Sequence, residues 1–220
     1  MTKKVKNREL FSKIPKDLAS LFSDNEYPWD ALKGLKQKVD SIIESPSDEY
    51  KVLRDGVLVG ENVSIHPSAV IEPPAVIGKN TQIRPGAYLR GYVFCGEGCV
   101  IGNSTELKHC ILMDSVQVPH YNYVGDSILG DHSHMGAGAI CSNLKSDGKN
   151  VVVHGEKEYE TNFRKLGGIL GDGADVGCGC VLNPGTVLGK NTAVYPLTAL
   201  RGVYPANSIV KDGKTIVKKR

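Results

Sequence analysis

Aromatic residues, long apolar runs and clustered charge of one sign are all scarce in this sequence. Phe, Trp and Tyr together make up 6% of the 220 residues, whereas glycine occurs 25 times. Few rings and many turn formers favour a repetitive β architecture. Lys and Arg number 27 against 24 Asp and Glu, without the cationic excess typical of nucleic-acid-binding domains. No run approaches the roughly 18 apolar residues of a membrane span, so we expect neither a nucleic-acid nor a membrane partner.

Paired cysteine motifs and a targeting segment are also missing. The six cysteines form no Cys-x-x-Cys pair and follow no disulfide-scaffold spacing. The first residues, MTKKVKNREL, lack the apolar stretch of a signal peptide. We therefore expect a protein of the reducing cytoplasm, with Cys95 and Cys141 as small buried hydrophobic residues.

The sequence does contain an apolar residue at every sixth position over long stretches. These positions are Val59, Ile65, Ile71, Ile77, Ile83, Leu89, Cys95, Ile101, Leu107 and Met113, then Leu129, Met135 and Cys141, and finally Leu170, Val176, Leu182, Leu188, Val194 and Leu200. Only 40% of the residues are hydrophobic, so chance does not explain an unbroken apolar pattern. In most repeats a small or β-branched residue follows four positions later.

A period of six matches neither the 3.6-residue period of a helix nor the two-residue period of a strand. A short strand followed by a tight turn satisfies it, and three such units close a triangular coil of about 18 residues. The apolar side chains then stack in one narrow core, and only the two ends expose strand edges. The sequence therefore predicts a mainly β fold, a parallel β-helix of about six coils.

Segments outside the repeat divide the chain. Residues 1–50 are predicted to be helical, and we expect their apolar faces to cap an end of the β-helix or to pack against a neighbour. Residues 51–207 are assigned to the β-helix, with an inserted loop at 142–169 that lacks the period. Residues 208–220 are predicted to form a C-terminal hairpin or tail with a turn at Asp212-Gly213.

Four segments carry a more specific signature. They are Ile83-Arg84-Pro85-Gly86, Gly102–Lys108 (GNSTELK), Val118–Asp126 (VPHYNYVGD) and Met135–Asn143 (MGAGAICSN). With the repeat, they resemble the hexapeptide-repeat transferases, in particular the acetyltransferase domain of bifunctional N-acetylglucosamine-1-phosphate uridyltransferases. The resemblance implies a left-handed β-helix, a homotrimer with sites between neighbouring chains, and acetyl-CoA as the acyl donor with no metal.

The resemblance also implies catalytic and substrate-binding roles for five matching residues. They are His120 as the general base, Arg84 and Lys108 as ligands of a sugar phosphate, and Tyr123 and Asn143 as contacts to the sugar. The chemistry agrees, because an amine that attacks a thioester must lose a proton near neutral pH and histidine suits that task. An arginine can fork onto a phosphate, and a lysine adds a point charge.

Contacts to acetyl-CoA follow from the same resemblance. Ala137 lies in the turn whose backbone N–H faces the thioester carbonyl, where a donor stabilises developing negative charge. Cys178 replaces a serine of the family near the thioester. The inserted loop offers cations for the phosphates of coenzyme A at Lys145, Lys149, Arg164 and Lys165. The sequence departs from the family at His134, which replaces an asparagine, and at Leu144, which replaces a tyrosine.

Three functional hypotheses follow. The first is an acetyl-CoA-dependent N-acetyltransferase that acts on an amino-sugar phosphate such as glucosamine 1-phosphate, with His120 as the base. The second is a non-catalytic trimeric module that binds a sugar phosphate or sugar nucleotide and partners a separate nucleotidyltransferase; the changes at His134, Leu144 and Cys178 point to it. The third is a zinc-dependent hydratase of the same fold, which would use His120, His132 and His134.

Overall fold

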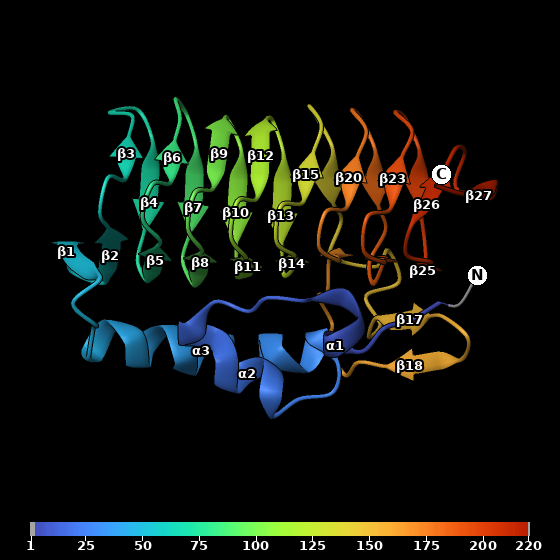
Figure 1. Ribbon diagram of the computed structural model, residues 1–220, viewed down its shortest axis with the longest axis horizontal. Coiled ribbons are helices and arrows are strands. Elements are labelled where there is room, and N and C mark those ends of the chain that lie inside the picture. The colour runs from blue at the N-terminus through green and yellow to red at the C-terminus, as the bar shows by residue number, and fades with distance from the viewer. Residues whose placement is uncertain (1–2, 220) are drawn as a thin grey trace.

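The computed structural model describes residues 3–219 as a triangular β-helix with a layer of helices along one side (Figure 1). Its strands form three long sheets, and successive coils pair in parallel within each sheet. The mainly β, stacked-coil fold predicted from the six-residue period is confirmed.

Sheets A, B and C form the three sides. Sheet A contains β1 (Tyr50–Arg54), β2 (Val57–Gly60), β5 (Ala75–Ile77), β8 (Val93–Cys95), β11 (Cys110–Leu112), β14 (Ile128–Leu129), β19 (Ile169–Leu170), β22 (Val187–Leu188) and β25 (Val203–Tyr204). Sheet B contains β3 (Ser64–Ile65), β6 (Gln82–Ile83), β9 (Val100–Asn103), β12 (Gln117–His120), β15 (His134–Met135), β20 (Asp175–Val176), β23 (Ala193–Val194), β26 (Ser208–Val210) and β27 (Ile216–Lys218). Sheet C contains β4 (Val70–Glu72), β7 (Tyr88–Arg90), β10 (Glu106–Lys108), β13 (Tyr123–Gly125), β16 (Ile140–Cys141), β21 (Val181–Leu182) and β24 (Ala199–Leu200).

The chain visits the sheets in the order A, B, C, which defines an A/B, a B/C and a C/A corner in every coil. Strands β1 and β27 pair antiparallel with β2 and β26 at opposite ends of the stack. Sheets A and B each retain eight parallel strands between these ends. The stack is therefore longer than the six coils expected.

Unequal coil lengths explain why the six-residue spacing of apolar residues is interrupted after Met113. Ile77 pairs with Cys95, eighteen residues further on, but Cys95 pairs with Leu112, only seventeen residues further on. The inward position after Leu107 therefore falls on Leu112 and not on Met113, which packs on the outside of sheet A. The β-helix continues without a gap through the stretch where the strict spacing is lost.

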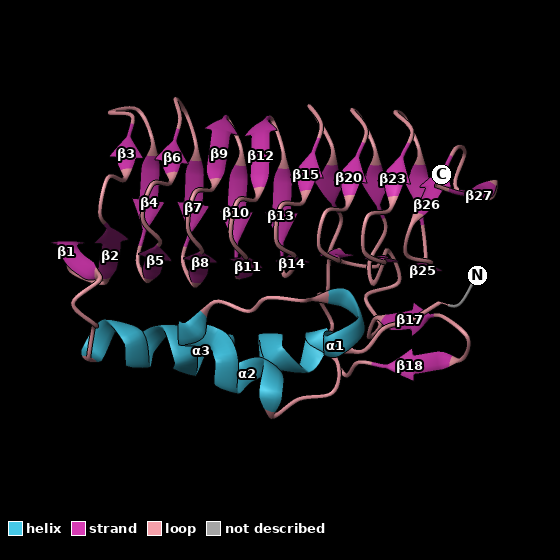
Figure 2. Ribbon diagram, viewed as in Figure 1, coloured by secondary structure: helices cyan, strands magenta, loops and turns pink. Residues whose placement is uncertain are grey.

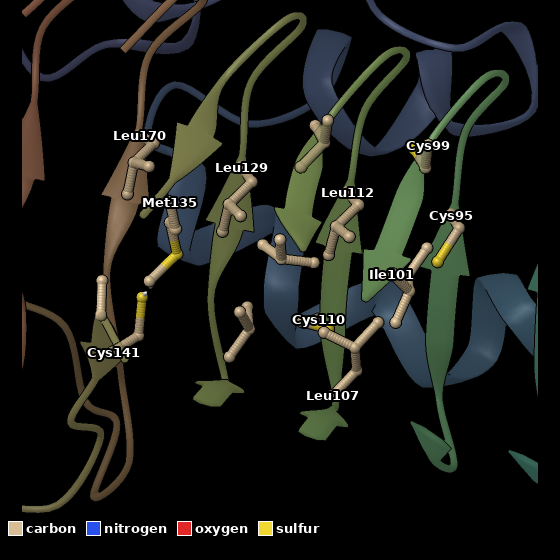
Figure 3. Packing of buried hydrophobic residues seen from close by; sticks show 14 of the residues in the cluster. Cys95, Cys99, Ile101, Leu107, Cys110, Leu112, Leu129, Met135, Cys141 and Leu170 are labelled. Carbon is tan, nitrogen blue, oxygen red and sulfur yellow. Dashed lines mark hydrogen bonds between the residues drawn. The ribbon is translucent and has the colours of Figure 1, made fainter. Parts of the chain in front are cut away.

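The interior of the stack is a single apolar column, part of which is shown in Figure 3. Cys95 and Cys141 lie in this column among leucine and isoleucine side chains. Burial raises the pKa of the Cys95 thiol and raises that of Cys141 to about 11. Both thiols are therefore protonated near neutral pH and pack as small hydrophobic groups.

The helices lie along sheet A and not across an end of the stack (Figure 2). They are α1 (Asn7–Leu10), the 3₁₀ turn η1 (Lys16–Leu18), α2 (Ala19–Ser23) and α3 (Pro28–Glu44). Helix α3 begins at Pro28, whose fixed φ suits a first turn. Its buried residues Leu32, Leu35, Val39 and Ile42 recur at helical spacing and form one apolar face.

The apolar face of α3 belongs to one cluster with a column of outward-pointing residues from sheet A. This column consists of Leu58, Val76, Phe94, Ile111, Ile128, Ile169, Val187 and Val203. The inserted loop adds to the same cluster through Val151, Val153 and Leu166, next to its hairpin β17 (Val152–His154) and β18 (Glu158–Glu160). The appendage and the loop together cover sheet A. No helix among residues 3–219 has the length and apolar character needed to cross a membrane.

Candidate active site

The turns at the B/C corner stack directly above one another. The carbonyl oxygens of Asn103, His120 and Ala137 each accept a hydrogen bond from the turn of the next coil, at 2.8, 3.0 and 2.8 Å. Asn103, His120, Ala137 and Cys178 therefore form one column, here called the His120 column, with about 4.8 Å between neighbouring strands. The last three are exposed. The structure thus brings the predicted base together with both predicted thioester contacts.

Asn122 joins two turns of the His120 column from inside. Its side chain is 2% exposed, and its Nδ2 donates to the carbonyls of Gly136 and Ala139 at 2.8 and 3.0 Å. Its Oδ1 accepts from the His120 N–H at 3.1 Å. Among residues 3–219, the backbone N–H of Ala137 has no hydrogen-bond acceptor. Asn122 therefore fixes the turn that carries the base and the turn that offers a free donor.

Three of the predicted substrate residues meet at the C/A corner around an aspartate. Asn143 Nδ2 donates to Asp126 Oδ2 at 2.6 Å and to the Tyr123 hydroxyl at 3.1 Å. Lys108 Nζ lies 3.4 Å from Asp126 Oδ2, and His109 Nδ1 lies 3.0 Å from Asp126 Oδ1. These five residues form the Asp126 cluster. Asp126 is predictable only as part of the motif Val118–Asp126, and His109 lies just outside the motif that ends at Lys108.

The charge on Asp126 holds this cluster together. Burial by itself would raise the pKa of Asp126, but the hydrogen bond from His109 and the positive charge of Lys108 outweigh it and lower the pKa. The carboxylate is therefore ionised near neutral pH and can only accept hydrogen bonds. Nδ1 of His109 must then carry the proton that it shares with Asp126.

A glycine makes room for the tyrosine in this cluster. A Cβ at Gly125 would collide with the Tyr123 hydroxyl and with the Asn143 amide. The Tyr123 ring therefore runs over Gly125, at the C/A end of β13. His120 precedes β13 at its B/C end. Within one chain, the predicted base and the predicted sugar contacts lie at opposite ends of this strand.

Arg84 lies apart from Lys108, its expected partner in phosphate binding. Arg84 follows β6 at the B/C corner, and its Nη2 lies 3.4 Å from Gln82 Oε1. Lys108 ends β10 at the C/A corner. A single chain therefore does not bring these two cations onto one phosphate.

The inserted loop contributes a pocket of about 440 Å³ beside the ends of sheet C. Its cations are Lys145 and Arg201, and Arg201 Nη2 lies 3.2 Å from Nε2 of His154, which also lines the pocket. The other predicted coenzyme A cations, Lys149, Arg164 and Lys165, are exposed elsewhere on the loop. Arg201 lies outside the loop and outside the sequence motifs, so no pattern in the sequence indicates its role.

The histidines considered for zinc point to different partners. His132 Nδ1 lies 3.0 Å from Asp131, and His134 Nδ1 lies 2.8 Å from Asp175 across β15 and β20. His120 belongs to the B/C corner. Within residues 3–219, no three His, Cys, Asp or Glu side chains gather as metal ligands. His120, His132 and His134 therefore do not converge on one point within residues 3–219 of this one chain.

Two family models match the chain. The bacterial transferase hexapeptide model (six repeats) matches residues 56–91, and the GMPPB C-terminal domain matches residues 81–161. The first of these matches and the stacked coils agree, so the chain contains a hexapeptide-repeat domain of the kind found in bacterial transferases.

Several relatives are named as bifunctional proteins. The bifunctional protein GlmU of Methanocaldococcus jannaschii is 36% identical over 79% of this chain and 43% of its own length. GlmU of Methanococcus maripaludis is 31% identical over 93% of this chain and 51% of its own. A bifunctional sugar-1-phosphate nucleotidylyltransferase/acetyltransferase of Sulfurisphaera tokodaii is 33% identical over 77% and 43%. The chain spans about half the length of these relatives.

Solved structures with a similar arrangement are more distant. UDP-N-acetylglucosamine acyltransferase from Campylobacter jejuni matches with a TM-score of 0.43 and 18% identity, over 70% of this chain and 74% of its own. A mutant of AntD, an N-acyltransferase from Bacillus cereus in complex with dTDP and coenzyme A, matches with a TM-score of 0.41 and 22% identity, over 74% and 83%.

Proposed function

We propose that the protein is an acetyl-CoA-dependent N-acetyltransferase that acts on an amino-sugar phosphate such as glucosamine 1-phosphate. The His120 column carries this proposal, because it stacks the exposed residue His120 next to the turn of Ala137, whose N–H has no acceptor among residues 3–219. The similarity to proteins named GlmU over most of the chain supports acyl transfer to a sugar derivative.

The geometry of the His120 column suits attack of an amine on a thioester. His120 accepts the proton of the amine as the new N–C bond forms. The N–H of Ala137 donates to the thioester oxygen, which gains negative charge in the transition state. The C–S bond then breaks, and the proton on His120 passes to the sulfur of coenzyme A. Asn122 holds the backbone of both turns during these steps.

The separation of His120 from the Asp126 cluster supports a site shared between chains. The two groups lie at opposite ends of β13. A neighbouring copy that turns its C/A corner towards His120 would supply the Lys108, Tyr123 and Asn143 side chains there. Sheets B and C are free of the helical cover and can form such contacts. We therefore propose a homotrimer with its sites between neighbouring chains.

A thiol-release assay with acetyl-CoA and glucosamine 1-phosphate tests the proposal. His120→Ala is expected to lower the rate by about 100-fold or more, while acetyl-CoA still binds. His132→Ala is the matched control, because this histidine is 71% exposed and lies outside the column. The proposal fails if His120→Ala acetylates at the wild-type rate, or if it has lost its fold by circular dichroism.

Failure of the wild type to release thiol separates the alternatives. Absence of release with retained acetyl-CoA binding would favour another amine or a sugar nucleotide as the acceptor. Absence of both release and acetyl-CoA binding would favour the binding module that partners a nucleotidyltransferase. Light scattering on the same samples tests the trimer.

A further inference from the structure

The seam between α3 and the C/A corner contains a pocket of about 440 Å³. Helix α3 lines it with Lys33 and Lys36, the β-helix with Arg90 and Lys108, and Tyr92 and Phe163 provide aromatic walls. The appendage, the coils and the inserted loop meet at this pocket, although they lie far apart in the sequence. We call it the seam pocket.

The cations of the seam pocket outnumber the carboxylates that neutralise them. The ion pairs are Lys33 with Asp30 at 2.6 Å, Arg90 with Glu106 at 2.7 Å and Lys108 with Asp126 at 3.4 Å. Lys36 has no carboxylate within 4.0 Å among residues 3–219, and its Nζ lies 5.0 Å from the centre of the Tyr92 ring. A cation–π contact orients a charge without neutralising it, so Lys36 presents a net positive charge.

Lys108 is also available to a ligand. Its ion pair with Asp126 is the longest of the three, and Asp126 already accepts shorter hydrogen bonds from Asn143 and His109. The Lys108 side chain is 27% exposed, so it can donate elsewhere without leaving Asp126 unpaired. Arg84, the other expected phosphate ligand, lies at the opposite corner of the same chain.

We propose that the seam pocket binds a phosphate monoester through Lys36 and Lys108, so that the N-terminal appendage forms part of the ligand site. A dianion is bound best by more than one cation, and Lys36 and Lys108 line the same pocket. Two ligands of the proposed reaction carry such a group, the sugar phosphate and the 3′-phosphate of coenzyme A. The inference deepens the proposed function and rests on it for these ligands.

Binding to the full-length chain tests this pocket without turnover. Isothermal titration with glucosamine 1-phosphate, coenzyme A and dephospho-coenzyme A is compared for wild type and Lys36→Met. We expect Lys36→Met to raise the Kd of one phosphate monoester about tenfold. Dephospho-coenzyme A, which lacks the monoester, should bind both proteins equally. Lys36→Arg should bind like wild type because it keeps the charge.

Lys38→Met provides the matched control, because Lys38 lies on the same helix but lines a different hollow. A weaker Kd for glucosamine 1-phosphate alone identifies the sugar phosphate as the ligand, and a weaker Kd for coenzyme A alone identifies its 3′-phosphate. Unchanged binding of both in Lys36→Met, or an equal loss in Lys38→Met, overturns the inference even if the enzyme is active. Binding that depends on Lys36 without any turnover keeps the inference and removes the proposed acetyltransferase.

Discussion

Sheets A and B have the same inward pattern but opposite outward surfaces. The central outward residues of sheet A are all apolar and almost fully buried, namely Leu58, Val76, Phe94, Ile111, Ile128, Ile169, Val187 and Val203. The corresponding residues of sheet B are mostly polar or small, namely Ser64, Gln82, Val100, Gln117, His134, Asp175, Ala193 and Ile209. Sheet A carries the helices, and sheet B does not.

The inward residue of each repeat builds the stack, whereas the outward residue decides what the stack contacts. A row of apolar side chains along one side must be covered, because exposed apolar patches of that size are unfavourable in water. Helix α3 has one apolar face of matching character. The covered side gives stability, and the uncovered sides are free to carry a site.

A charge at the centre of the covered side gives the largest expected effect. Ile111→Asp places a carboxylate in the apolar cluster on the outside of sheet A, where the residue is fully buried, and is expected to cost about 5 kcal/mol or more. Gln117→Asp makes a related change on sheet B, where the side chain is exposed, and should cost less than about 0.5 kcal/mol. Urea denaturation measures both. Equal losses would show that the two sides do not differ in burial.

Truncation from the helix side sharpens the same comparison. Leu35→Ala removes a fully buried side chain of α3 and is expected to lower the free energy of unfolding by about 2–5 kcal/mol. Gln37→Ala, on the exposed side of the same helix, should cost less than about 0.5 kcal/mol. Thermal denaturation followed by circular dichroism measures both. A wild-type melting curve for Leu35→Ala would mean that α3 does not pack on sheet A in solution.

The fold was predictable from the sequence because every coil repeats one contact with the axis. The length of the stack was not, since a seventeen-residue coil moves the inward position from Met113 to Leu112. The covered side was predictable in principle. Its outward residues, such as Val76 and Phe94, recur once per coil immediately before an inward residue. Each coil contains three six-residue repeats, however, and the six-residue period alone does not distinguish the repeat of sheet A from the other two.

Some residues of the candidate site were likewise predictable from the sequence, and others were not. Motifs placed His120 and Ala137 without three-dimensional information. Asp126 and Lys36 needed the structure, because their contacts join neighbouring coils or join the appendage to the stack. Asn122 was missed for a simpler reason. It lies four positions after the inward Val118, where most repeats have a small residue. The strict six-residue spacing does not include Val118, so it does not identify the position of Asn122.

Loss of the Asn122 side-chain amide at the B/C corner, between the uncovered sheets B and C, should give a smaller effect on stability but a more specific effect on catalysis. Asn122→Ala removes the side-chain donor to the Ala139 carbonyl and one of two donors to the Gly136 carbonyl, and is expected to cost about 1–3 kcal/mol. The kcat for acetyl transfer should fall at least tenfold with little change in KM, because both turns of the His120 column lose their fixed geometry. Thr198→Ala, at the matching position of a later coil, removes a buried hydroxyl far from His120. It should lose stability but not kcat, whereas an equal loss of kcat would refute the positioning role.

The smallest expected effect concerns the C/A corner, where the covered and uncovered sides meet. The lowered pKa of Asp126 means that its ionised form stabilises the fold at pH values above the ordinary carboxyl pKa of about 4. This stabilisation is lost as the pH falls through the lowered pKa, since protonation then breaks the contacts with His109 and Lys108. Asp126→Asn should therefore cost about 1 kcal/mol at pH 7 and lose part of the wild-type decline below pH 4. Asp175→Asn, on exposed sheet B, is the control for removing a carboxylate. Urea midpoints between pH 3 and 7 measure the difference, and an unchanged pH dependence in Asp126→Asn would mean that this carboxylate does not hold the corner together.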